Sequence, residues 1–156
     1  IDREAADRKA MAAAIATVLL ATEEEARRLS GESDPVNSAR ALLTRGSNLV
    51  VIKRGMAGCF LLTENDLHIA PGLPVAALDA TGAGDSLAAA VIYGYLNKFN
   101  LQALGDLANA TGAAKVLKLG TGHNMPTVDE VNAMLRRFGS SVALSPGTSI
   151  PDNSQA

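Results

Sequence analysis

The sequence predicts an α/β fold built on a doubly wound, mostly parallel sheet. Segments with strand character alternate with segments of helical character over residues 17–78, the order of elements in doubly wound sheets with right-handed crossovers. Residues 49–52 form a continuous apolar run after a helical segment, as expected of a parallel strand covered on both faces. The chain has 156 residues, 47% of them apolar, and a chain of about 150 residues can bury one hydrophobic core.

The individual elements follow from turn residues, helix formers and apolar runs. The expected strands are short and bounded by turn residues, and they cover residues 17–20, 48–53, 59–63, 68–70 and 75–78. The expected helices are rich in helix formers or apolar residues, and they cover residues 3–16, 23–30, 35–45, 85–97, 101–119 and 128–137. Because residues 85–97 are apolar on nearly every side, we expect that helix to be buried.

Local capping signals indicate where three of these helices begin. Thr22 with Glu25, and Thr127 with Glu130, have the Thr-x-x-Glu spacing of a capping box. Asp34 precedes a proline, which gives an N-cap residue followed by proline at the first helical position.

We expect one structured portion over residues 1–138 and a flexible tail over residues 139–156. The tail is rich in Ser, Pro, Gly and Thr and carries a single charge, Asp152. The chain lacks an initial Met and starts with helix-like residues, so we expect it to begin inside a longer protein.

Composition argues against several classes of protein. A net charge of −2 gives no general attraction for nucleic-acid phosphates, and the absence of Trp leaves little on which bases could stack. The longest apolar stretch, residues 11–21, is shorter than the roughly 20 residues that a membrane span needs. Cys59 is the only cysteine, which excludes an internal disulfide and favours a reducing compartment. We therefore expect a cytoplasmic protein that binds neither nucleic acid nor membranes.

The loop after the expected strand 75–78 is the first candidate site, because ligands in such folds bind outside the carboxyl ends of strands. Gly82 and Gly84 let the backbone approach a ligand, and the N–H groups at the following helix start can bind an anion. Asp85 suits a base that accepts a proton from a hydroxyl while these amides hold a phosphoryl group. The alternative is that Asp85 only caps the helix and the glycines only make a tight turn. Spacing alone supports the two interpretations equally.

Residues 79–85, Asp-Ala-Thr-Gly-Ala-Gly-Asp, resemble the Asp-Thr-x-Gly-Ala-Gly-Asp signature of the ribokinase-like, phosphofructokinase-B type carbohydrate kinases. The similarity continues in register over residues 17–137. Members of this family transfer the γ-phosphoryl group of ATP to a hydroxyl of a sugar or nucleoside. One departure is Ala80, which stands where the pattern usually has Thr.

The resemblance assigns roles within the same loop. It implies that Asp85 is the catalytic base and that Gly82, Ala83 and Gly84 form the anion hole. The function that it implies is ATP-dependent phosphoryl transfer to a hydroxyl of a sugar or sugar acid. A nucleoside kinase of the same fold, or a nucleotide-binding module without catalysis, remains as an alternative.

Two further stretches resemble the nucleotide-binding half of the family. Residues 53–58 resemble the strand and Gly-x-x-Gly turn along the ATP phosphates, and residues 107–114 resemble the small-residue helix beside the adenine ring. The implied nucleotide-binding residues are Lys53, Gly55, Gly58, Asn109 and Gly112. Without the resemblance, these stretches are accounted for by a β-turn with a cationic flank and by close helix packing.

The resemblance also implies metal ions as cofactors beside ATP. Glu25 stands at the Glu of the family's Asn-x-x-Glu segment, where it would act on Mg²⁺ through water. Thr22 replaces the Asn of that segment, and the capping box is a sufficient account of Thr22. Many relatives bind a monovalent cation at the position of residues 120–124, so Asp79, Thr81 and Asn124 are candidate ligands of K⁺.

The resemblance covers only the C-terminal portion of such a kinase. The family's N-terminal half contains the Gly-Gly segments that recognise the sugar and the small β lid, and neither has a counterpart in this sequence. The acceptor is therefore a small-molecule sugar, sugar acid or nucleoside whose identity the chain does not specify. A homodimer would form through the lid.

Overall fold

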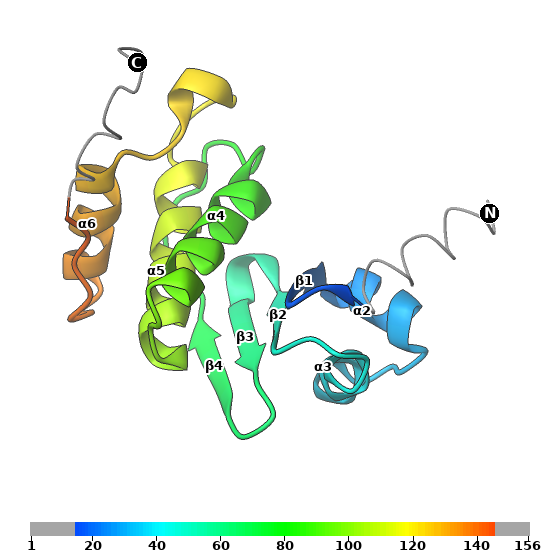
Figure 1. Ribbon diagram of the computed structural model, residues 1–156. Helices are drawn as coiled ribbons and strands as arrows, with labels where there is room; N and C mark the ends of the chain where they lie inside the picture. The colour runs from blue at the N-terminus through cyan, green and yellow to red at the C-terminus, as the bar shows by residue number, and fades with distance from the viewer. Residues whose placement is uncertain (1–14, 146–156) are drawn as a thin grey trace, which may run out of the picture.

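The computed structural model describes residues 15–145 and shows a sheet with helices on both faces (Figure 1). The strands are β1 (Val18–Thr22), β2 (Leu49–Lys53), β3 (Gly58–Leu62) and β4 (Leu67–Pro71). The helices are α2 (Glu23–Ser30), α3 (Pro35–Leu43), α4 (Ala83–Leu96), α5 (Leu101–Val116) and α6 (Val128–Arg137), with short 3₁₀ turns η1 (Gly55–Ala57) and η2 (Gly122–Asn124). The helix expected over residues 3–16 falls almost wholly outside the described residues.

The sheet is mixed, and its strand order is β1-β2-β3-β4. β1 and β2 are parallel, with Val18 opposite Leu49, whereas β3 is antiparallel to both β2 and β4. The α/β class is confirmed, but the described part of the sheet is not mostly parallel. The reason is the length of the connections, because a parallel pair needs a crossover of a dozen or more residues. Only η1 and a short turn at residues 63–66 join β2, β3 and β4.

Alternate residues of the central strands enter two different cores. Leu49 and Val51 of β2 pack with residues of α4 and α5, whereas Val50 and Ile52 pack with residues of α2 and α3. All four side chains are completely buried, which confirms that β2 is covered on both faces. This alternation follows from the two-residue period of a strand.

Residues 75–78 do not form the strand that the sequence predicts. They belong to an extended segment that crosses the end of α5, where the N–H groups of Leu78 and Asp79 both donate to the carbonyl of Val116. Leu78 is 62% exposed. Within the described residues no neighbouring strand lies alongside this segment, so its apolar residues have no ladder to join.

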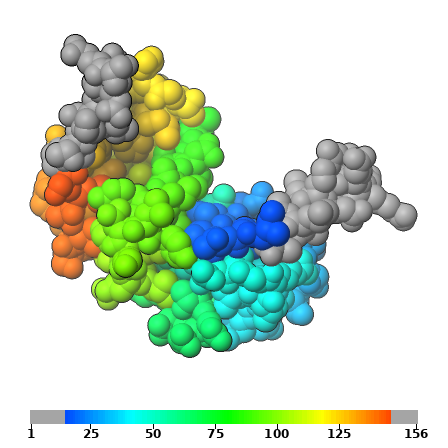
Figure 2. Space-filling view, in the orientation of Figure 1, coloured from blue at the N-terminus to red at the C-terminus, as the bar shows by residue number. Residues whose placement is uncertain are grey.

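The helix α4 is buried on one side only, which corrects the prediction of a helix buried all round. Val91 on its inner side is fully buried against the sheet and α5. Ile92, Tyr93 and Leu96 on its outer side are exposed, and the α4 and α5 part of the chain (green) reaches the surface in the space-filling view beside β1 (blue; Figure 2). Nothing within residues 15–145 covers this apolar side.

The first part of the expected flexible tail is held against the helices. The Ser140 hydroxyl donates to Asp106 Oδ2 over 2.7 Å, and Leu144 exchanges two hydrogen bonds with the Asn132 side chain. Val142 and Leu144 pack on the core formed by α5 and α6. The rest of that segment, from residue 146 onward, lies outside the described residues.

Candidate active site

The helix α4 begins with glycine rather than with a capping side chain. Gly82 is its N-cap residue, in the left-handed region with φ +79°, and makes no side-chain cap. The other four α-helices of residues 15–145 are capped by the side chains of Thr22, Asp34, Asn100 and Thr127. The first N–H groups of a helix have no partner within the helix. In α4 the N–H of Ala83 donates to the carbonyl of Ala80 over 3.1 Å, whereas those of Gly84 and Asp85 have no partner within the described residues and can bind a ligand.

Asp85 is the third residue of α4 and is exposed. Its carboxylate makes no hydrogen bond and no ion pair with any residue of the described chain. The alternative that Asp85 only caps its helix therefore does not describe the structure, because the cap is Gly82. An unpartnered carboxylate one turn into an uncapped helix is free to accept a proton from a bound hydroxyl.

Lys53 brings a positive charge to the same helix end. It is the last residue of β2, and its Nζ lies 3.6 Å from the position that a Cβ on Gly84 would occupy. An ammonium group beside a helix N-terminus reinforces its attraction for anions. Lys53 and the start of α4 thus form one anion-binding feature from two elements far apart in the sequence.

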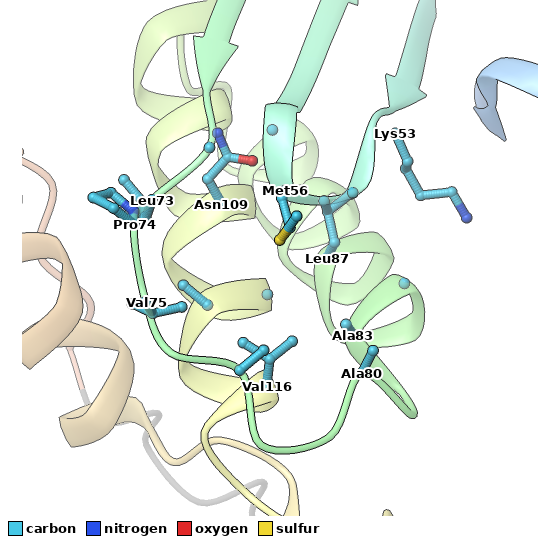
Figure 3. Close-up of a pocket in the computed structure, with 17 residues that line it drawn as sticks. Lys53, Met56, Leu73, Pro74, Val75, Ala80, Ala83, Leu87, Asn109 and Val116 are labelled. Atoms are coloured by element: carbon cyan, nitrogen blue, oxygen red, sulfur yellow. The ribbon is translucent and has the colours of Figure 1, made fainter.

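A cavity of about 470 Å³ opens beside this feature (Figure 3). Its lining contains all five of the predicted nucleotide-binding residues: Lys53, Gly55, Gly58, Asn109 and Gly112. Two residues of the predicted anion hole, Ala83 and Gly84, also line it. The structure therefore brings together residues that lie more than fifty positions apart in the sequence.

Much of the remaining cavity lining is apolar, and these residues were not predicted as site residues. They are Met56, Leu73, Pro74, Val75 and Val116. Figure 3 shows Leu73 and Pro74 on the wall facing Met56, with Val75 and Val116 below them. The signal in the sequence was the apolar segment 72–75, which we interpreted partly as a strand.

Asn109 has a structural part in this cavity wall. Its Nδ2 donates to the carbonyls of Ala70 (3.0 Å) and Pro71 (2.8 Å), and its Oδ1 lies 3.5 Å from the Sγ of Cys59. The amide group thereby fixes the end of β4 to α5. Cys59 is fully buried and burial raises its pKa to about 12, so it is a core residue and not a nucleophile.

Several predicted site residues do not line the cavity. Asp85 follows the lining residue Gly84 directly, and Gly82 precedes the lining residue Ala83. The predicted metal ligands Glu25, Asp79, Thr81 and Asn124 lie outside the lining as well.

Asp79 joins the two loops that flank the start of α4. Its Oδ1 accepts from the hydroxyl (2.7 Å) and the N–H (2.9 Å) of Thr81, and its Oδ2 accepts from the N–H of Gly120 (2.7 Å). These hydrogen bonds, above all those from Thr81, lower the pKa of Asp79 to about 2. Asn124 is in the second of these loops, where its Nδ2 donates to the carbonyl of Leu119.

Glu25 closes the predicted capping box at the start of α2. Its Oε2 accepts from the N–H (2.8 Å) and the hydroxyl (3.0 Å) of Thr22, and its own N–H donates back to that hydroxyl. The capping box is therefore confirmed. Within residues 15–145 no three His, Cys, Asp or Glu side chains are grouped closely enough to hold a metal ion by themselves.

Lys115 is a residue of this region that the sequence analysis missed. It lies in the last turn of α5 and is 0% exposed. Its Cε is 3.4 Å from the position of a Cβ on Gly82, and its Nζ donates to the carbonyl of Lys118 over 3.2 Å. The signal was present in the sequence, because this lysine shares a helical stripe with the buried residues Leu104 and Ala108.

Comparisons with known proteins identify the family. A family model described as pfkB family carbohydrate kinase matches residues 2–128. The ribokinase of Mus musculus is 34% identical over 122 residues, which cover 72% of this chain and 38% of that protein.

Two solved structures share the fold. A putative ribokinase II from E. coli, in complex with ATP and Mg²⁺, superposes with a TM-score of 0.80 at 27% identity, covering 86% of this chain and 44% of that one. A fructokinase double mutant from Vibrio cholerae O395, with fructose, ADP and a potassium ion bound, gives a TM-score of 0.75 at 25% identity, covering 85% and 45%.

The fold is that of an α/β protein with a cavity at the start of α4. The chain belongs to the pfkB family of carbohydrate kinases. It spans less than half the length of the relatives that it matches. Within residues 15–145 no helix is long and apolar enough to cross a membrane.

Proposed function

We propose that this chain is the nucleotide-binding and catalytic portion of an ATP-dependent carbohydrate kinase that phosphorylates a hydroxyl of a sugar or sugar acid. The observation that carries the proposal is the start of α4. An uncapped helix N-terminus, an unpartnered carboxylate at Asp85 and the ammonium of Lys53 lie together at the mouth of an otherwise apolar cavity. A module that only holds nucleotide has no use for a free carboxylate beside phosphates, so this feature favours catalysis over binding alone.

The two ends of the cavity suit the two ends of ATP. The apolar walls at Leu73, Val75 and Val116 would bury the adenine ring, since ligand pockets are mostly apolar with a few placed polar groups. The phosphates would extend toward Lys53 and the first turn of α4, where charge and N–H donors favour them. The E. coli neighbour described with ATP and Mg²⁺ supports the choice of ATP as the nucleotide.

In the proposed reaction Asp85 accepts the proton of the acceptor hydroxyl as its oxygen attacks the γ-phosphorus of ATP. The bond from phosphorus to the bridging oxygen breaks, and ADP leaves with that oxygen. The N–H groups of Gly82, Ala83 and Gly84 would stabilise the charge on the transferring group, that of Ala83 after it leaves the carbonyl of Ala80, and the Lys53 ammonium would add to this field. A Mg²⁺ ion bound with ATP would neutralise phosphate charge, and we assign Glu25 to act on it through water.

The acceptor is expected to be held by residues outside this chain. Asp85, Ala89, Ile92 and Leu96 recur at the spacing of one helix face and are all exposed, so whatever covers this apolar face also approaches Asp85. The resemblance implies that the sugar-recognising half and its lid take this place. A nucleoside acceptor is the second candidate, and a homodimer through the lid is part of the same proposal.

The first test is nucleotide binding by this chain, measured by calorimetry with ATP and ADP. We expect weak binding that Lys53→Met reduces further. Arg45→Met, which removes an exposed charge in the turn after α3, should have no effect. No binding of either nucleotide would contradict the proposal. Equal loss in both variants would show that only the overall charge matters.

The second test is a coupled ADP-release assay with pentoses, hexoses, sugar acids and nucleosides, run on the chain alone and on the intact enzyme. The chain alone should show no useful turnover, because an unpositioned acceptor forgoes an effective molarity on the order of 10⁵ M or more. Strong Asp85-dependent phosphorylation by the chain alone would show that acceptor recognition lies within it.

A further inference from the structure

Lys115 is the largest fully buried side chain of the described chain, and it carries a charge. Burying an ammonium group is unfavourable unless the charge is paired and hydrogen-bonded. Its only hydrogen bond within residues 15–145 goes to the carbonyl of Lys118. The burial of this charged side chain therefore needs an explanation other than hydrophobic packing.

The surroundings of Lys115 supply that reason. Its side chain passes beneath Gly82, the N-cap of α4, and its ammonium reaches the loop that follows α5. That loop is bonded to Asp79 through Gly120. The Lys115 charge is also close enough to contribute to the low pKa of Asp79. The ammonium therefore lies among the segments that carry the candidate cation ligands Asp79, Thr81 and Asn124.

A lysine ammonium group and a monovalent cation can have the same electrostatic role between these segments. Each brings one positive charge, and each binds backbone carbonyl oxygens, as Lys115 binds that of Lys118. Because the ammonium group is covalently part of the protein, no ion has to bind from solution. A second cation at this place would be repelled by the ammonium.

The candidate ligands are themselves already bonded. Both oxygens of Asp79 accept hydrogen bonds from Thr81 and Gly120, and the Thr81 hydroxyl donates to Asp79. Two hydrogen bonds already use Asp79 Oδ1, so K⁺ would have to bind this carboxylate through Oδ2, which also accepts from Gly120. The residues of this chain therefore fit an internal ammonium better than a bound K⁺.

We propose that the buried ammonium group of Lys115 replaces the monovalent cation beneath the phosphate-binding loop, so that this protein does not depend on potassium. The proposal deepens the proposed function, on which it rests for the role of the loop. It also revises our own expectation that Asp79, Thr81 and Asn124 bind K⁺. The fructokinase from Vibrio cholerae O395, described with a potassium ion, would then represent the other solution to the same electrostatic requirement.

The test measures thermal unfolding of this chain in KCl and in choline chloride at equal ionic strength. Wild type should have the same midpoint in both salts. Lys115→Ala should unfold lower by on the order of 5–10 °C. KCl or ammonium chloride, but not choline chloride, should raise that midpoint by roughly 3 °C, as binding of an ion to the vacated site predicts.

Two variants separate charge from packing. Lys115→Met fills the space without a charge and should remain insensitive to the choice of cation. Leu107→Ala opens a cavity in the same helix without removing a charge, and it should lose stability equally in all three salts. Restoration of Lys115→Ala by K⁺ with no response of these two variants would support the proposal.

Two results would overturn it. A potassium-specific rise in the midpoint of wild type would show that the cation site persists, and this measurement needs no variant to fold. A folded Lys115→Ala that no small cation restores would show that Lys115 is only a core residue. Because unfolding is measured without nucleotide, a chain that binds no ATP would contradict the proposed function while leaving this result intact.

Discussion

The helices α4 and α6 begin in opposite ways, although both have a carboxylate at their third position. At α6 the Thr127 hydroxyl accepts from the N–H of Glu130, and Glu130 Oε2 accepts from the N–H of Thr127 over 2.7 Å. Lys118 adds an ion pair of 2.9 Å to the same carboxylate. At α4 the N-cap is Gly82, which has no side chain, and the carboxylate of Asp85 makes no bond with any residue between 15 and 145.

The start of α6 forms hydrogen bonds between its own backbone and side chains, whereas the start of α4 leaves N–H groups and a carboxylate available to a ligand. The N–H of Thr127 and the side chain of Lys118 hold the pKa of Glu130 below its usual value. The role of this carboxylate is therefore structural. The helix α2 repeats the closed arrangement with Thr22 and Glu25. A glycine at the N-cap gives up the side-chain cap that the other helices have, and it leaves Asp85 available to a ligand.

The largest effect should come from Asp85→Asn in the intact enzyme. If Asp85 is the base, kcat should fall by roughly 10²–10⁴, the usual contribution of general base catalysis. The unfolding midpoint should not change, because Asp85 bonds to nothing in the described chain. Steady-state ADP release and thermal unfolding measure the two quantities.

Glu130→Gln is the matched control, since it removes an acid from the same helical position of α6. It should leave kcat unchanged. Near-normal turnover of Asp85→Asn, or an equal loss in Glu130→Gln, would contradict the assignment of Asp85 as the base.

The second effect concerns Glu25, which has the same local bonds as Glu130. Glutamine can also close a capping box, so Glu25→Gln and Glu130→Gln should both fold normally. If Glu25 acts on Mg²⁺ through water, only Glu25→Gln should raise the Mg²⁺ concentration needed for half-maximal activity, by roughly tenfold. A Mg²⁺ titration that does not distinguish the two variants would leave Glu25 with its capping role alone.

The third effect distinguishes the two glycines of the α4 start. A Cβ on Gly84 would meet Lys53 Nζ at an ordinary 3.6 Å, so Gly84→Ala should fold and gain helix propensity. The methyl group would stand between the ammonium and the helix N-terminus, and we expect ATP affinity to fall by roughly three- to tenfold, about 0.7–1.4 kcal/mol.

Gly82→Ala should behave differently, because φ is +79° there and the Cβ would approach Thr121 Cγ2 at 3.0 Å. A non-glycine residue in this region costs about 1–2 kcal/mol, so the unfolding midpoint should fall. Calorimetry and thermal unfolding of both variants test the distinction. If Gly84→Ala unfolds like Gly82→Ala, both glycines serve the fold and the anion hole loses its support.

Local signals in the sequence predicted the elements whose causes are local. The capping boxes at Thr22 and Thr127 and the N-cap Asp34 all occur where the spacing placed them. The buried run of β2 was also predicted correctly. The five residues predicted to bind nucleotide, from Lys53 to Gly112, all line one cavity, and their role stays a prediction.

The predictions that were wrong or missing concern features that depend on tertiary contacts, which a short segment of sequence does not determine. Residues 75–78 have strand composition, but a strand needs a neighbour, and within the described chain Leu78 meets only the end of α5. The outer side of α4 is apolar, but burial depends on what covers it. Lys115 was overlooked because composition places lysines at the surface, whereas its depth follows from how α5 packs beneath Gly82.

The smallest effect is the pH dependence of the bonds that Asp79 makes between the two loops. Its pKa is about 2 in the folded protein and about 3.9 in an unfolded chain. Between these values the unfolded state binds more protons, so stability rises with pH through this window. The contribution of Asp79 is therefore complete above about pH 5 and is lost as the pH falls toward 2. Asp79→Asn lacks this titration, so the gap between its unfolding midpoint and that of wild type should be widest at neutral pH and should narrow between pH 4 and pH 2. Unfolding midpoints of both proteins at pH 7, 4 and 3 measure this gap, and a gap at pH 3 as wide as that at pH 7 would show that the carboxylate charge does not hold the loops together.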